Sequence, residues 1–301
     1  MAPLSPEPAA TRLITPVLVT YNSATILPWS LPALARCATV VVVDNRSADG
    51  TVSEVRRLLP QAEVIDAGRN LGFGRANNLG IAAVRSEFAL LLNPDARLED
   101  GALEALADAA RRWPEAAMIA PVLFDAPGVV GDFFRGAPGM PASRERPVPE
   151  GDLCAEFVTG AAMLLNLRLM REVGFFDPWF FLYHEDDELC ARVRRAGHPI
   201  VVAHAARVEH HVRGSSPSTA RTTLRRHYCM TLSKLYMTRK LRGRGACVAL
   251  AARTAFASLL ALPLMALTLQ RERALRHAAR GAAALLAWRH LRRAHCFEPK
   301  D

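Results

Sequence analysis

The sequence lacks the cysteine spacings that zinc-binding, redox-active and disulfide-rich proteins share. Its six cysteines are widely scattered, and none forms a pair of the metal-binding or redox kind. We therefore expect reduced thiols in a folded core. The N-terminus also lacks a basic stretch followed by an apolar run, so we expect no secretory signal and predict the cytoplasm as the compartment.

Acidic residues are scarce in the last part of the chain. Residues 213–301 contain 18 Lys and Arg but only 3 Asp and Glu, a net charge of +15, whereas residues 1–212 carry −6. The net charge of +9 therefore combines two unlike parts. An acidic body with a basic tail is typical of a soluble catalytic domain held near a negative surface, either anionic lipid or nucleic acid.

Internal repeats and long low-complexity tracts are also missing. Half of the 301 residues are apolar and 22% are charged, which is the composition of an ordinary folded protein. A chain of this length can enclose an active-site cleft. Only residues 1–12, which include MAPLSPEPAA, are expected to be disordered.

Apolar runs rich in Val, Ile and Leu alternate with segments of helical spacing in the first half. The runs are residues 16–22, 39–45, 62–68, 88–96 and 116–124, and the helical segments are 25–35, 51–59, 74–86 and 101–112. This alternation predicts an α/β fold in which helices cover both faces of a mostly parallel sheet. Such sheets bind ligands at the carboxyl ends of their strands.

The second half has a different pattern. Residues 126–151 are rich in Pro and Gly and predict a long loop over the cleft. Residues 157–170 predict a strand that runs into a helix. Residues 175–211 predict an aromatic loop, a helix closed by Gly197 and a further strand.

The segment GRNLGFGRANNLG, residues 68–80, lacks the third glycine of a dinucleotide-binding fingerprint. It also follows the third predicted strand instead of the first, although Asp95 stands about twenty positions further on. We interpret Gly72 and Gly74 as residues that permit a tight turn before the next helix.

Two strand ends carry candidate metal ligands. Asp95, two residues after Asn93, ends a buried strand and is suited to hold a hard divalent cation that bridges phosphate oxygens. The alternative is a strand-end turn built on Asn93 and Pro94. His210 and His211 follow another strand, and a neutral imidazole can complete such a site, although a lone histidine is more often structural.

The segment YHEDDELCARVRRAG carries a candidate base. Asp186 shares the apolar stripe of the predicted helix with residues at i+3, i+4 and i+7, namely Leu189, Cys190 and Val193. Glu188 lies mostly off this stripe. An inward carboxylate in a first helical turn stays ionised and available as a base. Alternatively, Glu185, Asp186 and Asp187 are only favourable N-terminal helix charges.

The chain resembles the inverting glycosyltransferase family 2, particularly its rhamnosyltransferase-like branch, in seven segments that occur in the family's order. These are VLVTYNSATIL, VVVDNRSADGT, NLGFGRANNLG, LLLNPDA, FVTGAAMLL, FFDPWFFLYHEDDELCARVRRAG and HVRGSS. The resemblance covers about residues 13–240, which we predict to be the catalytic domain, and leaves residues 241–301 as a basic helical tail.

The resemblance implies a GT-A fold, a Rossmann-like nucleotide-diphospho-sugar transferase fold, that binds a nucleoside-diphosphate sugar. The residues that it assigns to the nucleotide-sugar pocket are Thr20, Tyr21, Asn22, Asp44, Asn70, Arg75, Asn78 and Asn93. It places Asn93-Pro94-Asp95 at the family's DXD motif, with Asp95 binding Mg²⁺ or Mn²⁺. Asn93 replaces the first acid of that motif, and a neutral amide is a weaker metal ligand.

The same resemblance implies the reaction. HEDDE stands at the family's ED motif, so Asp186, with Glu185 beside it, would be the catalytic base that deprotonates an acceptor hydroxyl for attack with inversion. His211, in a His-x-x-Gly-x-Ser pattern with Gly214 and Ser216, would join Asp95 at the metal, with His210 as the alternative.

The acceptor would bind near FVTGAAM and the aromatic loop. The residues assigned to it are Thr159, Gly160 and Tyr183, and Tyr183 is a candidate for stacking on a sugar face.

Residues 254–269 form an apolar stretch without a charge, flanked by basic clusters. The stretch is short for a membrane span and contains Pro263. We predict a helical segment that lies on or re-enters an anionic membrane surface. The alternative is a helical hairpin that packs on the catalytic body.

The combined prediction is a cytoplasmic, metal-dependent inverting glycosyltransferase, peripheral at the inner face of the cell membrane. Its donor would be dTDP-L-rhamnose, by family analogy, and its acceptor a glycan or lipid-linked glycan in cell-surface polysaccharide synthesis. A sugar nucleotidyltransferase is the enzymatic alternative, but VTYNSAT lacks the Gly-rich basic loop such an enzyme needs. The other alternative is a basic-tailed nucleic-acid-binding protein, although no nucleic acid partner is expected.

Overall fold

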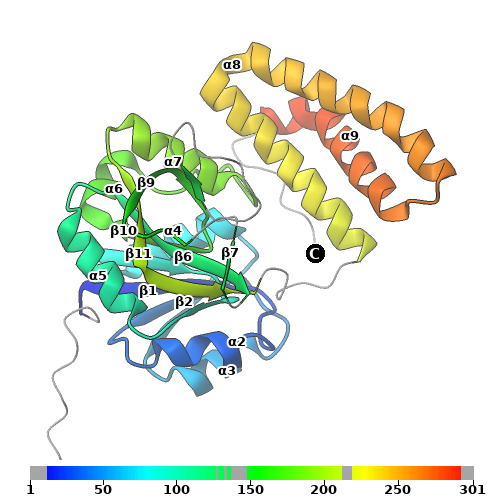
Figure 1. Ribbon diagram of the computed structural model, residues 1–301. Coiled ribbons are helices and arrows are strands. Elements are labelled where there is room, and N and C mark those ends of the chain that lie inside the picture. Colours follow the sequence, from blue (N-terminus) through cyan, green and yellow to red (C-terminus); the bar gives the residue numbers. More distant parts are fainter. Residues whose placement is uncertain (1–11, 127, 132–133, 137–147, 212–218, 293–301) are drawn as a thin grey trace, which may run out of the picture. The chain divides into compact units, whose positions relative to one another are not determined.

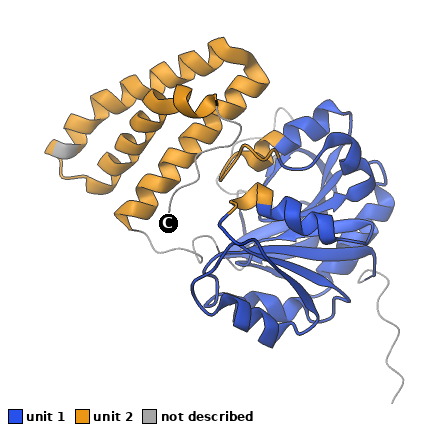
Figure 2. Cartoon of the chain, turned by 180° about the vertical axis from the view of Figure 1, so that it is seen from behind, with its two compact units in different colours: residues 1–70, 76–176, 189–215 blue, residues 71–75, 177–188, 216–301 orange. Residues whose placement is uncertain are grey.

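The computed structural model describes residues 12–126, 128–131, 134–136, 148–211 and 219–292. The chain divides into two compact units, drawn in different colours in Figure 2. The first unit comprises residues 1–70, 76–176 and 189–215, and the second comprises residues 71–75, 177–188 and 216–301. Residues 1–11 of the expected disordered segment, much of the expected loop over 126–151, and Gly214 and Ser216 lie outside the described residues.

An eleven-stranded sheet forms the core of the first unit (Figure 1). Its order is β3-β2-β1-β4-β10-β6-β11-β9-β8, with β5 paired to β11 and β7 paired to β6. The strands are β1 (Ile14–Thr20), β2 (Val40–Asp44), β3 (Ala62–Asp66), β4 (Phe88–Leu92), β5 (Ala96–Leu98), β6 (Met118–Ala126), β7 (Val129–Val130), β8 (Phe134–Gly136), β9 (Leu153–Val158), β10 (Ala162–Asn166) and β11 (Ile200–His210).

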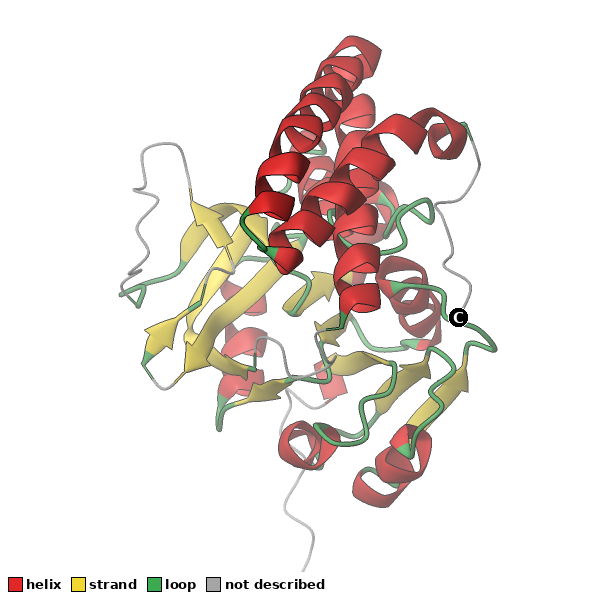
Figure 3. Cartoon of the chain, turned by 90° about the vertical axis from the view of Figure 1, so that its right-hand side faces the viewer, coloured by secondary structure: helices red, strands yellow, loops and turns green. Residues whose placement is uncertain are grey.

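Helices lie on both faces of this sheet (Figure 1). Figure 3 shows the helices in red and the strands in yellow. Before the tail, the helical segments are α2 (Leu27–Ser30), the 3-10 turn η1 (Leu31–Leu34), α3 (Thr51–Leu58), α4 (Phe73–Ala83), α5 (Ala102–Arg112), α6 (Leu167–Val173) and α7 (Glu185–Arg195). The predicted α/β class is therefore confirmed, and each apolar run of the first half lies on a strand.

Two predicted strands are interrupted in the structure. The run 88–96 forms β4 only as far as Leu92, because Pro94 has no N–H to continue the ladder, and β5 then pairs with β11 instead. The segment 157–170 contains the end of β9, a turn and β10 before α6 begins at Leu167. The predicted strand that runs into a helix is therefore β10 followed by α6, and the end of β9 precedes it.

The parallel register brings polar strand ends to one edge of the sheet. Strands β1, β2 and β3 pair in parallel, with Thr20 opposite Asp44 and Asp44 opposite Asp66. All five residues of β2 are buried, as expected for a valine-rich strand covered on both faces. The buried core thus fixes where Thr20 and Asp44 emerge.

Gly80 lets α4 pack directly against β1 and β2. A Cβ atom at this position would lie 2.5 Å from Cγ1 of Val17, closer than packed atoms approach, and 3.0 Å from Cγ2 of Val43, a tight contact. A glycine is therefore required for the helix to lie this near the sheet.

The second unit contains a helical hairpin formed by α8 (Ala220–Leu267) and α9 (Arg271–Leu291), coloured orange in Figure 2. Gly243 interrupts α8 with φ 86° and ψ 176°, so the helix consists of two parts, and Pro263 lies within the second part. Buried Ser258 of α8 lies against Gly281 of α9. The tail prediction of a helical segment thus corresponds to the second part of α8.

The division into compact units groups residues 216–240 with the tail, whereas the sequence analysis assigned them to the catalytic domain. Within the described residues, one helical stretch, Ala220–Met265, has the length and composition of a membrane-spanning helix.

Candidate active site

Asp44 is a buried carboxylate held by three hydrogen bonds at the end of β2. Its Oδ1 accepts bonds from Thr20 Oγ1 at 3.0 Å and Ser47 Oγ at 2.6 Å, and its Oδ2 accepts one from the Ser47 N–H at 2.8 Å. Asp44 is only 4% exposed and Thr20 is fully buried. These hydrogen bonds replace those that the buried carboxylate would make to water, and they fix its orientation.

Asn22 joins the loops that follow β1 and β2. Its backbone N–H donates to Ser47 Oγ at 2.9 Å, and its side-chain oxygen accepts a bond from the Ala48 N–H at 2.8 Å. Its φ of 50° is left-handed, a conformation that asparagine tolerates better than most residues. Tyr21, which precedes it, is half-buried. The structure therefore brings Thr20, Asn22 and Asp44 together through Ser47.

Asp95 and His210 approach each other beside the end of β4. The distance between His210 Nε2 and Asp95 Oδ1 is 3.5 Å, and the Asp95 side chain is largely buried. His210 is the last residue of β11 and pairs with Ala96 of β5, which places it next to Asp95. His211 instead contacts Asp95 through its backbone, since its N–H donates to the Asp95 carbonyl at 2.9 Å.

The ring of His211 points to a different neighbour. It stacks on Trp29 with ring centroids 4.0 Å apart and an angle of 20°. The sequence preferred His211 as the metal-binding histidine, but the structure brings the His210 ring nearer to the Asp95 carboxylate. Neighbouring residues at a strand end direct their side chains to opposite sides, and this separates the two rings.

The Asp95 and His210 pair fits one part of a divalent cation site. Among the described residues, no three His, Cys, Asp or Glu side chains form a group that could hold a metal ion. Mg²⁺ usually keeps one or two carboxylate ligands and takes the remainder from substrate phosphates and water. A carboxylate with an adjacent imidazole at a strand end therefore fits a cation shared with a bound diphosphate.

Asn93 lies next to the turn predicted to receive the acceptor. Its backbone N–H donates to the Ala161 carbonyl at 2.9 Å, directly after Thr159 and Gly160. Thr159 is half-buried and Gly160 is buried between β9 and β10. The structure thus joins the predicted DXD region to the predicted acceptor segment.

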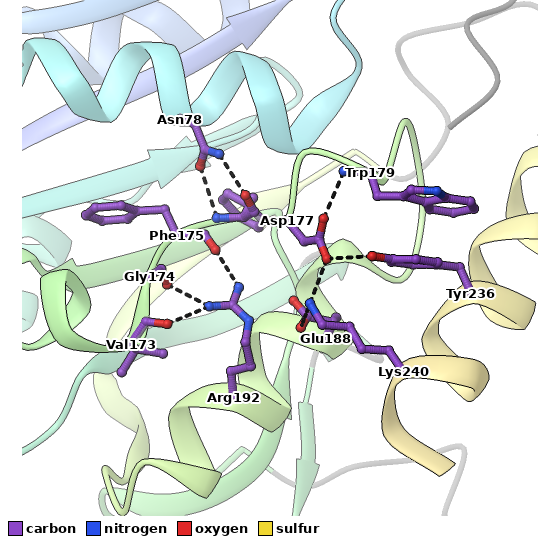
Figure 4. A network of polar contacts seen from close by, with 11 residues as sticks. Asn78, Val173, Gly174, Phe175, Asp177, Trp179, Glu188, Arg192, Tyr236 and Lys240 are labelled. Carbon is purple, nitrogen blue, oxygen red and sulfur yellow. Dashed lines mark hydrogen bonds and ion pairs between the residues drawn. The ribbon is translucent and has the colours of Figure 1, made fainter. Parts of the chain in front are cut away.

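Asn78 and Arg75 both bond to the protein backbone. The Asn78 amide donates to the Phe176 carbonyl at 2.8 Å and accepts from the Phe176 N–H at 3.0 Å (Figure 4). Arg75 Nε donates to the Leu71 carbonyl at 2.7 Å. Asn70 is half-buried. The contacts of Asn78 and Arg75 therefore hold the backbone at these two positions.

Gly72 approaches the aromatic loop within the second unit. Its φ is 81°, and a Cβ atom there would lie 2.1 Å from the Phe181 carbonyl oxygen. The Phe73 N–H donates to that same oxygen at 3.0 Å. Only glycine satisfies both the backbone conformation and the close approach.

The aromatic loop enters α7 through two strained residues. Tyr183 and His184 both have positive φ, 70° and 64°, immediately before Glu185. Left-handed conformations of such side chains are costly and concentrate at functional sites. The ring nitrogen Nδ1 of His184 lies 2.8 Å from Asp187 Oδ2. Burial raises the pKa of Tyr183.

The acidic side chains at the start of α7 differ in burial. Asp186 is half-buried, and Glu185 is 5% exposed. Burial, with the neighbouring charges of Asp186 and Asp187, raises the pKa of Glu185 well above its ordinary value. Leu189, which follows these acids, is fully buried, as the apolar stripe predicted.

Glu188 was expected mostly off the inward stripe, yet it is fully buried. Its Oε1 lies 2.7 Å from Lys240 Nζ, which supplies the opposite charge that a buried carboxylate requires. The expectation was wrong because helical periodicity within α7 carries no information about α8.

Arg192 holds the loop that precedes the aromatic segment. Its Nη1 donates to the carbonyls of Val173 at 2.8 Å and Gly174 at 2.9 Å, and its Nη2 donates to that of Phe175 (Figure 4). Sequence reasoning missed Arg192, Ser47 and Lys240 as contributors. Only Ser47 had a local signal, since it follows a strand within DNRSADG.

Comparison with known proteins identifies the family. Residues 16–162 match the family described as Glycosyl transferase family 2. An N-acetylglucosaminyl-diphospho-decaprenol L-rhamnosyltransferase of Mycobacterium tuberculosis is 28% identical, with 73% of this chain and 83% of that protein covered. The low-salt glycan biosynthesis hexosyltransferase Agl10 of Haloferax volcanii is 26% identical over 60% of this chain and 61% of its own length.

A solved structure shares the fold. The mannosyltransferase PcManGT of Pyrobaculum calidifontis, in complex with GDP-Man and Mn²⁺, has a TM-score of 0.55 and 18% identity, covering 92% of this chain and 87% of its own. The chain carries a glycosyltransferase family 2 domain, similar to rhamnosyltransferases, and is a glycosyltransferase of the GT-A fold.

Proposed function

We propose that this glycosyltransferase moves L-rhamnose from a nucleoside-diphosphate donor, dTDP-L-rhamnose, to a hydroxyl of a lipid-linked glycan, with inversion at the anomeric carbon. The relative from Mycobacterium tuberculosis, whose name specifies L-rhamnose and an N-acetylglucosaminyl-diphospho-decaprenol, supports the donor and the acceptor class. The observation that carries the reaction type is the half-buried Asp186 in the first turn of α7.

Asp186 is the best candidate for the general base among the acids of HEDDE. Glu188 is fully buried and ion-paired to Lys240. Glu185 is buried with a raised pKa, which favours its neutral form, and Asp187 is bound to His184. Asp186 is a partly exposed carboxylate in the first turn of α7, where its Oδ1 accepts a hydrogen bond from the Asp187 N–H at 2.9 Å and the helix dipole favours the ionised form. It would take the proton of the acceptor hydroxyl as that oxygen attacks the donor.

The polar edge of the sheet would bind the nucleotide. Asp44, fixed by Thr20 and Ser47, is a rigid acceptor for a base N–H or a ribose hydroxyl. Asp95, with His210, would hold a divalent cation, Mg²⁺ or Mn²⁺. When bound, such a cation supplies positive charge against the leaving diphosphate. Thr159 and Gly160 would border the acceptor.

The α8–α9 hairpin would bind an anionic membrane surface on the cytoplasmic side. Exposed apolar residues follow helical spacing along the second part of α8: Phe256, Leu259, Leu260, Leu264 and Leu267. This spacing puts them on one face of the helix. Arg271 and Arg273, just beyond its end, add positive charge. An apolar face beside basic residues is the composition of interfacial helices, and it suits a lipid-linked acceptor.

The decisive experiment measures sugar transfer by the purified enzyme. A panel of nucleotide sugars is tested with a lipid-linked N-acetylglucosamine diphosphate and Mn²⁺, and NMR reports the configuration of the product. We expect transfer from dTDP-L-rhamnose with inversion. The Asp186→Asn variant should lose at least about 100-fold in kcat because the base is removed, while donor affinity is retained.

Asp187→Asn is the matched control, since it removes a neighbouring carboxylate of the same helical turn. It should keep most of the wild-type turnover. Comparable turnover of wild type and Asp186→Asn would remove Asp186 as the base. Absence of transfer from every nucleotide sugar would refute the proposed donor class.

A further inference from the structure

Within the second unit, one face of α8 lies against residues 177–188, the segment that carries Asp186. The α8 residues on this face recur every three or four positions before the break at Gly243 and are Arg225, Cys229, Leu232, Ser233, Tyr236 and Lys240. This spacing is that of a single helical face. We define residues 177–188 as the catalytic loop.

Apolar and ring contacts fix the middle of the catalytic loop. Trp179 and Phe181 are at most 3% exposed and belong to a cluster with buried residues of α8 and α9. The Trp179 ring stacks on Tyr236 with centroids 3.7 Å apart and an angle of 11°. Ser233 Oγ donates to the Leu182 carbonyl at 2.9 Å. The loop is therefore packed against α8 along its length.

Lys240 ties the two ends of the catalytic loop to one ammonium group. Its Nζ lies 2.6 Å from Asp177 Oδ2 at the start of the loop and 2.7 Å from Glu188 Oε1 at its end (Figure 4). The hydroxyl of Tyr236 donates to the same Asp177 oxygen at 3.0 Å. Eleven positions separate these two acids in the sequence, and the ammonium is the bridge between them.

The charges of this group depend on one another. Burial opposes ionisation of Lys240 and of Asp177. The hydrogen bonds from Lys240 to Asp177 and Glu188 nevertheless raise the pKa of Lys240. The same bond from Lys240, with those from Trp179 and Tyr236, lowers the pKa of Asp177. The carboxylate of Glu188 is fully buried. Removal of the ammonium would leave a buried charge without its ion-pair partner, which is strongly unfavourable.

We propose that Lys240 is a positioning residue for the glycosyl transfer, which holds the first turn of α7 and with it the Asp186 carboxylate. The inference rests on the proposed role of Asp186. Lys240 acts through Asp177 and Glu188 and has no role in substrate contact. The first part of α8 is then a component of the catalytic machinery, in addition to any role of the hairpin at a membrane.

The first test is the kinetics of Lys240→Met in the full-length enzyme. We expect kcat to fall about 10- to 100-fold, because small displacements of a reacting group have effects of this size, while the donor KM stays close to wild type. Lys240→Arg should recover most of kcat, since a guanidinium can still bond to both carboxylates. Arg276→Met, which removes an exposed ion pair with Glu272 on α9, is the matched control.

Tyr236→Phe provides a milder variant in case Lys240→Met folds poorly. It removes one hydrogen bond to Asp177 and keeps the ring that stacks on Trp179. We expect a smaller loss of kcat with an unchanged melting temperature. Wild-type kcat in a folded Lys240→Met, or in Tyr236→Phe where Lys240→Met does not fold, would overturn the inference.

The second test requires no turnover. Hydrogen–deuterium exchange of amides 177–188 should accelerate in Lys240→Met but not in Arg276→Met, while the strand amides of the first unit stay protected. Unchanged exchange in the catalytic loop would overturn the inference. An inactive wild type with this exchange pattern would refute the proposed function alone. An active wild type with dead Asp186→Asn and fully active Lys240→Met would refute the positioning role alone.

Discussion

At the scale of single residues, the four acids at the start of α7 differ in burial and in their bonding partners. Glu188 is fully buried and bonded to Lys240, whereas Glu185 is buried and has a side-chain oxygen, Oε2, for which the described residues offer no hydrogen-bond partner. Asp187 is bound to His184, and Asp186 is partly exposed. Environment, and not residue type, therefore separates the candidate base from its neighbours.

The buried Glu185 predicts a pH-dependent stability difference. Its pKa is raised by burial, so above its unfolded value near 4.5 the unfolded chain releases a proton that the folded protein retains. Stability is therefore lost as pH rises from the unfolded pKa towards the folded pKa. The Glu185→Gln variant lacks this loss. Its melting temperature should therefore exceed that of wild type, and the difference should grow as the pH is raised from 5 to 8.

Differential scanning fluorimetry across this pH range measures the effect. Glu172→Gln, at an exposed position of α6, is the control and should follow wild type at each pH. A difference between Glu185→Gln and wild type that does not change with pH would show that Glu185 titrates normally.

The two histidines after β11 predict different effects on metal binding. The His210 ring lies 3.5 Å from Asp95, whereas the His211 ring stacks on Trp29. His210→Ala should weaken Mn²⁺ binding, measured by calorimetry in the presence of a nucleoside diphosphate, by about tenfold or more. His211→Ala should have a much smaller effect. The reverse ranking would favour the sequence-based assignment to His211.

At the scale of elements, the break at Gly243 divides α8 into two parts with different surfaces. The first part contacts the catalytic loop through Tyr236 and Lys240. The second part is packed on α9 through Ser258 and exposes an apolar stripe on its other side. The stripe has no packing role within the described part of the second unit, so a lipid surface is its proposed partner.

The stripe predicts vesicle binding that depends on apolar area and charge. The double variant Leu259→Glu/Leu260→Glu should bind phosphatidylglycerol vesicles at least about tenfold more weakly in a sedimentation assay, because two leucines no longer enter the interface. Val129→Glu changes an exposed valine in β7, outside the stripe, and should bind like wild type. Equal binding by the double variant would exclude the stripe as the contact.

At the scale of the whole molecule, local patterns predicted the fold well. Runs rich in Val, Ile and Leu predicted β1 to β4 to within a few residues, and the nearly continuous apolar runs of β1, β2 and β4 correspond to strands that are almost wholly buried. The ordered motifs also pointed to family 2, which the match over residues 16–162 bears out. Strand-end residues such as Asp44 followed from the topology of a parallel sheet.

Contacts between distant parts of the chain escaped prediction. Asn78 bonds to Phe176, and Glu188 pairs with Lys240, across 98 and 52 positions respectively. Nothing in the local sequence around Glu188 indicates its partner, since a helix's periodicity reports only its own faces. The choice between His210 and His211 also depended on the pairing of β11 with β5.

The sequence by itself determined the alternation of the main strands and helices in the first half, the polar strand ends and the charge division, because these depend on residue type and spacing along the chain. The tertiary structure decided which side chains meet: His210 with Asp95, and Lys240 with Asp177 and Glu188. These contacts depend on packing, because a buried acid requires a partner that only the folded chain can bring within bonding distance.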